Sequence, residues 1–188
     1  MLNTYIIDTS VLADEEKFRF YYNKMPAERK KKIDRVKHRN DKELSLGAGI
    51  LENEFAGEGF YHNLSHSGSR AVLAVSDGAV GIDIEPVREY SMKIVRRFFS
   101  EREQAYVSMN GAEGFFRIWT LKEAFMKATG EGISLGIDSF ETVPEADDIK
   151  LIQYHDKNHW VYSEFCQDGY RAAVCALEKV EMLTPFVI

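Results

Sequence analysis

Cysteine is scarce in this 188-residue chain, which contains only Cys166 and Cys175. If Asp168-Gly169 forms a two-residue hairpin turn, Cys166 lies opposite Arg171 and Cys175 lies opposite Tyr162. The two sulfur atoms are then too far apart to form a disulfide. We therefore expect two reduced core thiols in a cytoplasmic protein.

Long apolar runs are also missing, since none approaches the roughly 18 residues of a membrane-spanning helix. The first residues lack a basic segment followed by a cleavage site, so we expect no signal peptide. Only 4 prolines, with 45% hydrophobic and 29% charged residues, argue against disorder. No Gly/Ser-rich linker interrupts the chain, and its length suits a single folded domain.

The net charge of −6 is unevenly distributed. The stretch "ERKKKIDRVKHR" (28–39) holds seven Lys or Arg residues against two acids. A non-specific nucleic-acid binder would be basic overall, so we expect no nucleic-acid partner. A basic helix on an acidic protein either faces solvent or binds a phosphorylated ligand or an acidic partner.

Periodicity predicts a similar order of elements twice along the chain. The first half should form a strand at 4–8, helices at 14–24, 26–38 and 41–55, and strands at 60–65, 71–76 and 79–85. The second half should form helices at 91–98, 101–109 and 113–129 and strands at 133–142, 149–155, 159–166 and 170–177. Asp77-Gly78 and Asp168-Gly169 are typical hairpin turns.

The expected fold class is therefore α+β, with two similar halves that share one interface. In each half the helices would pack on a three-stranded antiparallel meander, and a pseudo-two-fold axis would relate the halves. The cleft between them is the expected ligand site.

The run "VGIDIEP" (80–86) places two carboxylates in an apolar segment. In a strand, Asp83 and Glu85 share the face opposite Ile82 and Ile84. Their Cα atoms would lie roughly 6–7 Å apart, so both carboxylates could converge on one cation. An edge strand with a solvated polar face is the alternative.

Two further stretches carry polar side chains at informative spacings. In "EGFFRIWTLKEAFMKAT" (113–129), Glu123 and Lys127 lie one helical turn apart, either as a surface pair or as site residues. In "NLSHSGS" (63–69), Ser65, His66 and Ser67 offer donors for phosphate oxygens. The composition of that segment opposes a helix, so we expect no zinc site there.

Taken together, "NLSHSG", "GIDIEP", "RFFSEREQAYV" and "WTLKEAFMKATGEGISL" resemble the 4′-phosphopantetheinyl transferase superfamily, in the longer, pseudo-dimeric, surfactin-synthetase-activating type. The resemblance implies Mg²⁺-dependent transfer of 4′-phosphopantetheine from coenzyme A to a serine of an apo acyl or peptidyl carrier protein, releasing 3′,5′-ADP. It also implies an N-terminal pseudo-repeat (1–85) on the coenzyme A side and a C-terminal one (86–188) that docks the carrier. We expect a cytoplasmic monomer without a membrane partner.

The resemblance assigns roles residue by residue. The metal carboxylates would be Asp83, Glu85 and Glu123. Glu123 would also be the general base, directly or through water, and Lys127 would stabilise charge at the reacting phosphate. The residues implied to bind coenzyme A are Lys31, Ser65, His66 and Lys122. The carrier would dock near Arg96, Arg97, Arg102 and Arg117.

The chain departs from the family pattern on the coenzyme A side. No lysine occurs in the segment 52–62 where the family usually has a Gly-Lys-Pro sequence, and Glu28 stands where a basic residue is common. The alternatives are a non-catalytic binder of coenzyme A or carrier protein and, less favoured, a metal-dependent phosphohydrolase acting on a nucleotide.

Overall fold

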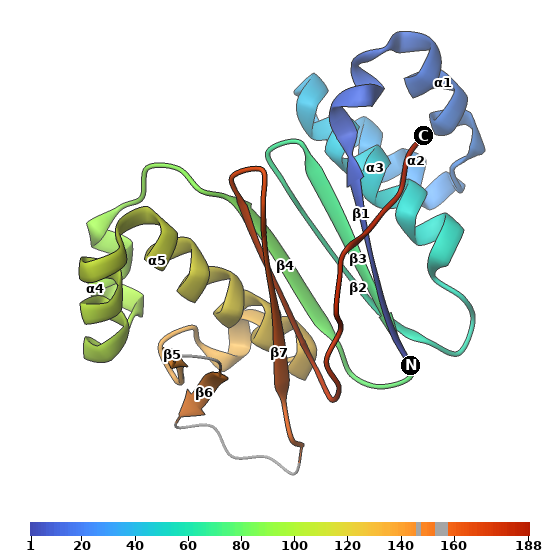
Figure 1. Ribbon diagram of the computed structural model, residues 1–188. Helices are drawn as coiled ribbons and strands as arrows, with labels where there is room; N and C mark the ends of the chain where they lie inside the picture. Colours follow the sequence, from blue (N-terminus) through green and yellow to red (C-terminus); the bar gives the residue numbers. More distant parts are fainter. Residues whose placement is uncertain (146–147, 153–157) are drawn as a thin grey trace.

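Two sheets lie near the centre of the molecule, with helices on the outer side of each (Figure 1). The computed structural model describes residues 1–145, 148–152 and 158–188. The first half forms β1 (Leu2–Asp8), a 3-10 turn (Thr9–Ala13), α1 (Glu15–Lys24), α2 (Ala27–Arg35), α3 (Arg39–Phe55), β2 (Tyr61–Ser67) and β3 (Arg70–Ser76). The remainder forms β4 (Gly81–Pro86), α4 (Met92–Phe98), α5 (Glu101–Thr129), a 3-10 turn (Gly132–Leu135), β5 (Glu141–Glu145), β6 (Asp148–Ile152), β7 (Val161–Gln167), β8 (Tyr170–Ala176) and β9 (Thr184–Pro185). A mixed α+β fold with antiparallel sheets is confirmed.

The alternation of side chains along the strands separates the hydrophobic cores. On β3, Leu73 and Val75 pack toward the helices of the first half, whereas Val72 and Ala74 pack toward the second sheet. Ile82 and Ile84 of β4 join this inter-sheet core, which leaves Asp83 and Glu85 on the opposite face, as predicted.

The predicted three-stranded meanders are wrong in both halves, because β4 does not join β2 and β3, and β6 pairs with β5 in a separate two-stranded sheet instead of with β7. The strand order is β2-β3-β1-β9 in one sheet and β4-β8-β7 in the other. Because β3 pairs with β2 along one edge and with β1 along the other, it has no free edge for β4. Asp77-Gly78 therefore does not turn a hairpin, and β4 crosses to pair antiparallel with β8.

The second predicted hairpin is confirmed, with Gln167 opposite Tyr170 around Asp168-Gly169. Cys175 lies opposite Tyr162 and is buried, but Cys166 is exposed, so only one of the two thiols belongs to the core. The reason is its place near the tip of the hairpin, beyond the cover of α5.

The two helices predicted at 101–109 and 113–129 are consecutive parts of α5, which is interrupted at Gly111 by backbone angles of φ 59° and ψ −138°. The long strand predicted at 133–142 is wrong over most of its length. Gly130, Gly132 and Gly136 adopt φ values of 73°, 55° and 76°, which bend the chain into turns before β5 begins. The prediction at 149–155 agrees with β6 as far as Ile152, and residues 153–157 lie outside the described part of the chain.

The C-terminal segment runs across both sheets, which the sequence did not predict (Figure 1). Val180 N donates to Ser163 Oγ of β7 at 3.0 Å, and β9 then pairs parallel with β1. Phe186 stacks edge-on against Phe55 of α3, with ring centroids 5.1 Å apart. Within the described residues, no helix has the length and apolarity needed to cross a bilayer.

Candidate active site

The candidate site lies where β4, β2 and the C-terminal half of α5 meet. Gly81 makes this approach possible, because a Cβ atom there would collide with Ala124 O and Ala128 N of α5. The absence of a side chain at Gly81 lets the helix lie directly on the strand. Glu123 and Lys127 are thereby brought beside the carboxylates of β4.

Asp83 is the buried centre of the site, with 5% of its surface exposed. Its Oδ1 accepts hydrogen bonds from Lys127 Nζ at 2.7 Å and from Ser65 Oγ at 2.8 Å. Its Oδ2 is buried without a hydrogen-bond partner among the described residues. Burial raises the pKa of Asp83, while the Lys127 ammonium and the Ser65 hydroxyl oppose that rise.

Glu85 and Glu123 complete a group of three carboxylates. Burial raises the pKa of Glu85, and the charge of Asp83 adds to that rise. Burial also raises the pKa of Glu123, and the charges of Asp83 and Glu85 raise it further, against the attraction of Lys127. The mutual repulsion shows that the three predicted metal carboxylates are close enough to affect one another electrostatically.

The donor types fit a divalent cation, although a complete ligand shell is not preformed. Carboxylate oxygens are the ligands that Mg²⁺ prefers, and the unpartnered Oδ2 of Asp83 is a buried acceptor without a donor. In the described part of the chain, no three Asp, Glu, His or Cys side chains are already arranged around one metal position. Lys127 Nζ instead supplies the positive charge beside Asp83, at 2.7 Å.

His66 lies at the edge of the site on β2, with an exposed side chain. Partial withdrawal of its ring from water lowers its pKa, and the nearby charges of Lys127 and Arg29 lower it further. Arg29 of α2 is thus a neighbour of the site that the sequence analysis missed. The basic stretch 28–39 held the signal, but not which of its side chains turns inward.

Lys31, unlike Arg29, points its side chain into solvent. Its side chain is 62% exposed and forms an ion pair with Glu28 at 2.7 Å, one turn back on α2. The Arg29 side chain is only 12% exposed and is ion-paired with Glu52 of α3. Of these two α2 side chains, Arg29 is the one whose charge acts on His66, in addition to that of Lys127.

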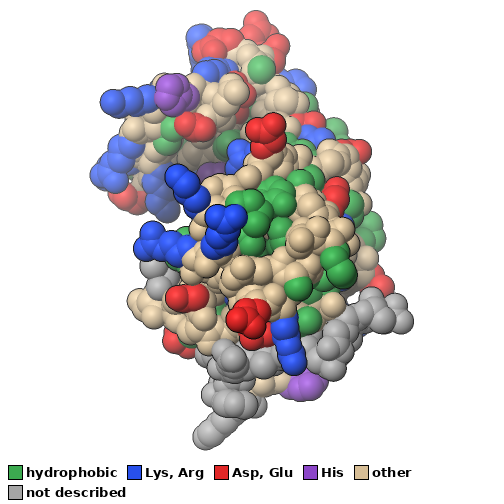
Figure 2. Space-filling view, turned by 90° about the vertical axis from the view of Figure 1, so that its left-hand side faces the viewer, with side chains coloured by type: hydrophobic (Ala, Val, Ile, Leu, Met, Phe, Trp, Pro, Cys, Tyr) green, Lys and Arg blue, Asp and Glu red, His purple; other side chains and the backbone are tan. Residues whose placement is uncertain are grey.

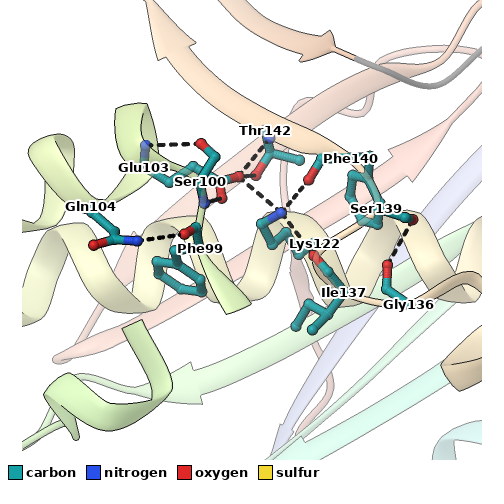
Figure 3. A network of polar contacts seen from close by, with 10 residues as sticks. All are labelled: Phe99, Ser100, Glu103, Gln104, Lys122, Gly136, Ile137, Ser139, Phe140 and Thr142. Carbon is teal, nitrogen blue, oxygen red and sulfur yellow. Dashed lines mark hydrogen bonds and ion pairs between the residues drawn. The ribbon is translucent and has the colours of Figure 1, made fainter. Parts of the chain in front are cut away.

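The predicted coenzyme A contact of Lys122 is wrong, because its ammonium points into the protein interior (Figure 3). Lys122 Nζ lies 2.9 Å from Glu103 Oε1, and both side chains are 0% exposed. Nζ also donates to Ile137 O at 2.9 Å and to Phe140 O at 2.5 Å. Lys122 and Lys127 are five residues apart on α5, about 140° around the helix, so they cannot reach the same side.

Arg117 and Trp119 both make their contacts within the fold. Arg117 forms a two-pronged ion pair with Glu164, at 2.7 and 2.6 Å, and donates to Tyr106, so it is engaged within the fold rather than available for docking. Trp119 packs against a hydrophobic core and stacks on Phe115.

A groove of about 370 Å³ opens beside Glu85. Its walls come from β4, the segment before α4, α4 itself and α5, and they include Glu85, Arg88, Glu89, Tyr90, Ser91, Ile94, Phe115, Phe116 and Trp119. The carboxylate of Glu85 is therefore accessible from the surface. On the face shown in Figure 2, Lys and Arg side chains gather beside a hydrophobic patch.

Known proteins of one family are similar to this chain. The profile of the 4′-phosphopantetheinyl transferase superfamily matches residues 79–175. The 4′-phosphopantetheinyl transferase psf-1 of Bacillus pumilus is 40% identical over 136 residues, which cover 66% of this chain and 58% of that protein. The 4′-phosphopantetheinyl transferase Sfp of Bacillus subtilis (strain 168) is 34% identical over 122 residues, which cover 62% of this chain and 54% of that protein.

The chain thus spans just over half the length of these curated relatives. The crystal structure of Thermotoga maritima holo-[acyl-carrier-protein] synthase is 24% identical, with a TM-score of 0.44 over 52% of this chain and 61% of that chain. The profile match covers more than half of the chain and includes β4, α4, α5 and nearly all of β8. This chain belongs to the 4′-phosphopantetheinyl transferase superfamily.

Proposed function

We propose that this protein transfers 4′-phosphopantetheine from coenzyme A to a serine of an apo acyl or peptidyl carrier protein. The observation that supports it best is the buried Asp83, held by Lys127 and Ser65 beside Glu85 and Glu123 within the region that matches the superfamily. Phosphoryl transfer depends on positioning and on neutralising charge, and this cluster can do both.

The reaction forms a bond from the serine Oγ to the β-phosphorus of coenzyme A and breaks the bond from that phosphorus to the bridging oxygen, so that 3′,5′-ADP leaves. Glu123 receives the serine proton, directly or through water. Its raised pKa makes it a better base near neutral pH than an ordinary carboxylate. Lys127 stabilises the charge on the reacting phosphate.

Asp83, Glu85 and Glu123 are the proposed Mg²⁺ ligands. Bound Mg²⁺ supplies positive charge that polarises the phosphoryl oxygens. Ser65 and His66 are the proposed phosphate contacts, together with Arg29, whose charge reaches His66. Lys31 is the weaker candidate, because its ammonium is exposed and paired with Glu28.

The two larger sheets share a similar order of strands, which favours two pseudo-repeats related by a pseudo-two-fold axis. In the first half, β1 precedes the helices and pairs with β3, the second strand of the β2–β3 hairpin. In the second half, β4 precedes the helices and pairs with β8, the second strand of the β7–β8 hairpin. The proposed division at residues 85 and 86 is best moved ahead of β4, which pairs with β8. We further propose that the protein works as a cytoplasmic monomer.

The test is to incubate the protein with coenzyme A, Mg²⁺ and an apo peptidyl carrier protein and to measure the intact mass of the carrier. We expect addition of phosphopantetheine, loss of the reaction when a chelator removes the metal, and loss of at least two orders of magnitude in rate for Asp83→Asn. Coenzyme A binding without transfer would show a non-catalytic binder. Hydrolysis of coenzyme A without carrier would show a phosphohydrolase.

The carrier is proposed to dock at the exposed arginines of α4, Arg96 and Arg97. An acidic carrier would meet local positive charge there, although the protein has a net charge of −6. Arg96→Glu/Arg97→Glu should slow modification of an acidic carrier and flatten its salt dependence. The control Arg19→Glu/Lys24→Glu reverses the same charge on α1 and should have little effect. An equal loss on a short serine peptide would contradict docking.

A further inference from the structure

The two sheets meet along β2 and β4 without a backbone ladder between them. Within the described residues, β2 pairs only with β3, and β4 pairs only with β8. Each is therefore an edge strand with unpaired backbone groups directed at the other sheet. The two edges are joined instead by side chains.

Three side chains of β2 make these contacts, and they alternate along the strand. Asn63 Oδ1 accepts from Ile82 N at 3.0 Å, which satisfies a backbone donor of β4. Ser65 Oγ donates to Asp83 Oδ1 at 2.8 Å, and Ser67 Oγ donates to Glu85 Oε2 at 2.7 Å. We call this row the β2–β4 seam. It places both proposed metal carboxylates on the line where the sheets join.

Both carboxylates are held in the same manner. One oxygen of Asp83 is held by Ser65 and Lys127, and Oδ2 remains without a partner in the described structure. One oxygen of Glu85, Oε2, is held by Ser67 at 2.7 Å and by Arg88 at 3.4 Å. Its Oε1 accepts no hydrogen bond from the described residues. Each carboxylate thus keeps one oxygen available for a ligand.

Of these contacts, the one from Ser67 restrains the less buried of the two carboxylates. Glu85 is half-buried, at 21% exposure, and has one more rotatable bond than Asp83. Arg88 is 64% exposed and its contact with Glu85 is long, so it restrains the carboxylate weakly. Asp83 is fixed by burial and by two short hydrogen bonds, whereas Glu85 depends mainly on Ser67.

We propose that Ser67 is a positioning residue, whose hydroxyl fixes Glu85 so that its free oxygen can bind a divalent cation together with Asp83. This inference rests on the proposed function for the identity of the cation. It assigns Ser67 no contact with coenzyme A or with the carrier. Hydrogen-bonding partners of ligand carboxylates commonly change metal affinity by about 10- to 100-fold when they are removed.

The experiment measures Mn²⁺ binding to the full chain from the electron paramagnetic resonance signal of free Mn²⁺, first alone and then with coenzyme A present. The variants are Ser67→Ala, which removes the hydroxyl, Ser67→Thr, which retains a hydroxyl at this position of β2, and the control Ser69→Ala. The Ser69 hydroxyl is 3.3 Å from Tyr170 and touches neither carboxylate. Thermal unfolding of each variant checks the fold.

We expect Ser67→Ala to weaken Mn²⁺ binding about tenfold, Ser67→Thr to restore most of it, and Ser69→Ala to match the wild type. In the transfer assay, Ser67→Ala should raise the Mg²⁺ concentration needed for half-maximal rate and change kcat little at saturating Mg²⁺. If transfer fails but Mn²⁺ binding still depends on the Ser67 hydroxyl, the positioning role stands and the proposed function falls.

Three results would overturn the positioning role. They are equal Mn²⁺ affinity in the wild type and Ser67→Ala, equal weakening in Ser67→Ala and Ser67→Thr, and no Mn²⁺ binding by the wild type in either condition. The first two would leave the transferase activity itself untouched.

Discussion

Replacing Lys122 by methionine should destabilise the protein more than any exposed charge change. Methionine retains much of the side-chain length but leaves the Glu103 carboxylate without its cation, in a place where both side chains are 0% exposed. It also removes the donor of Ile137 O and Phe140 O. Breaking a buried ion pair from one side costs about 3–5 kcal/mol. For a chain of this length, the melting midpoint should fall by about 6–20 °C.

The contacts of Glu103 explain why the loss should spread beyond one ion pair (Figure 3). Its Oε1 accepts from Thr142 N at 2.8 Å, and its Oε2 accepts from Ser100 N at 2.9 Å in the capping box of α5. Glu103 and Lys122 lie on either side of Gly111, where the helix is interrupted. The pair therefore joins the two parts of α5 to the chain that leads into β5.

The assay is urea unfolding followed by circular dichroism at neutral pH. In Lys122→Met, the stranded Glu103 carboxylate keeps its desolvation cost without an ion-pair partner. Adding Glu103→Gln should recover part of the loss by removing the charge.

Lys31→Met, which removes an exposed lysine from α2, is the matched control and should barely move the midpoint. A deficit below about 1 kcal/mol in Lys122→Met would refute the reasoning, because it would mean that Glu103 is not a buried, unpaired charge in the variant.

Two other predictions concern the site itself. Gly81→Ala should cost about 1–3 kcal/mol of stability, because the new Cβ pushes α5 away from β4. It should also lower kcat sharply, because the Glu123 carboxylate on α5 then moves away from Asp83. Kinetics and thermal unfolding measure both effects, and a normal kcat would show that the close approach is dispensable. Arg29→Ala should weaken coenzyme A binding in calorimetry more than Lys31→Ala does, with less effect at high salt. The reverse order would place the phosphates along the exposed side of α2.

Much of the local structure was determined by the sequence alone. The alternation in "VGIDIEP" placed Ile82 and Ile84 in a core and the two acids on the other face of β4, because successive side chains of a strand must point apart. Asp168-Gly169 formed its hairpin because residues 168 and 169 adopt the positive φ values that this turn requires. These features depend only on neighbours along the chain.

The tertiary structure decided what depends on partners distant in sequence. Asp77-Gly78 has the same turn chemistry, yet β1 already occupies the edge of β3 that the hairpin would need. Lys122 and Lys127 are alike in a helical sequence, and only the position of Glu103 and of the chain before β5 makes one of them interior. The role of Ser67 likewise appears only when the edges of β2 and β4 meet, since a hydroxyl acquires a function from the group that it faces.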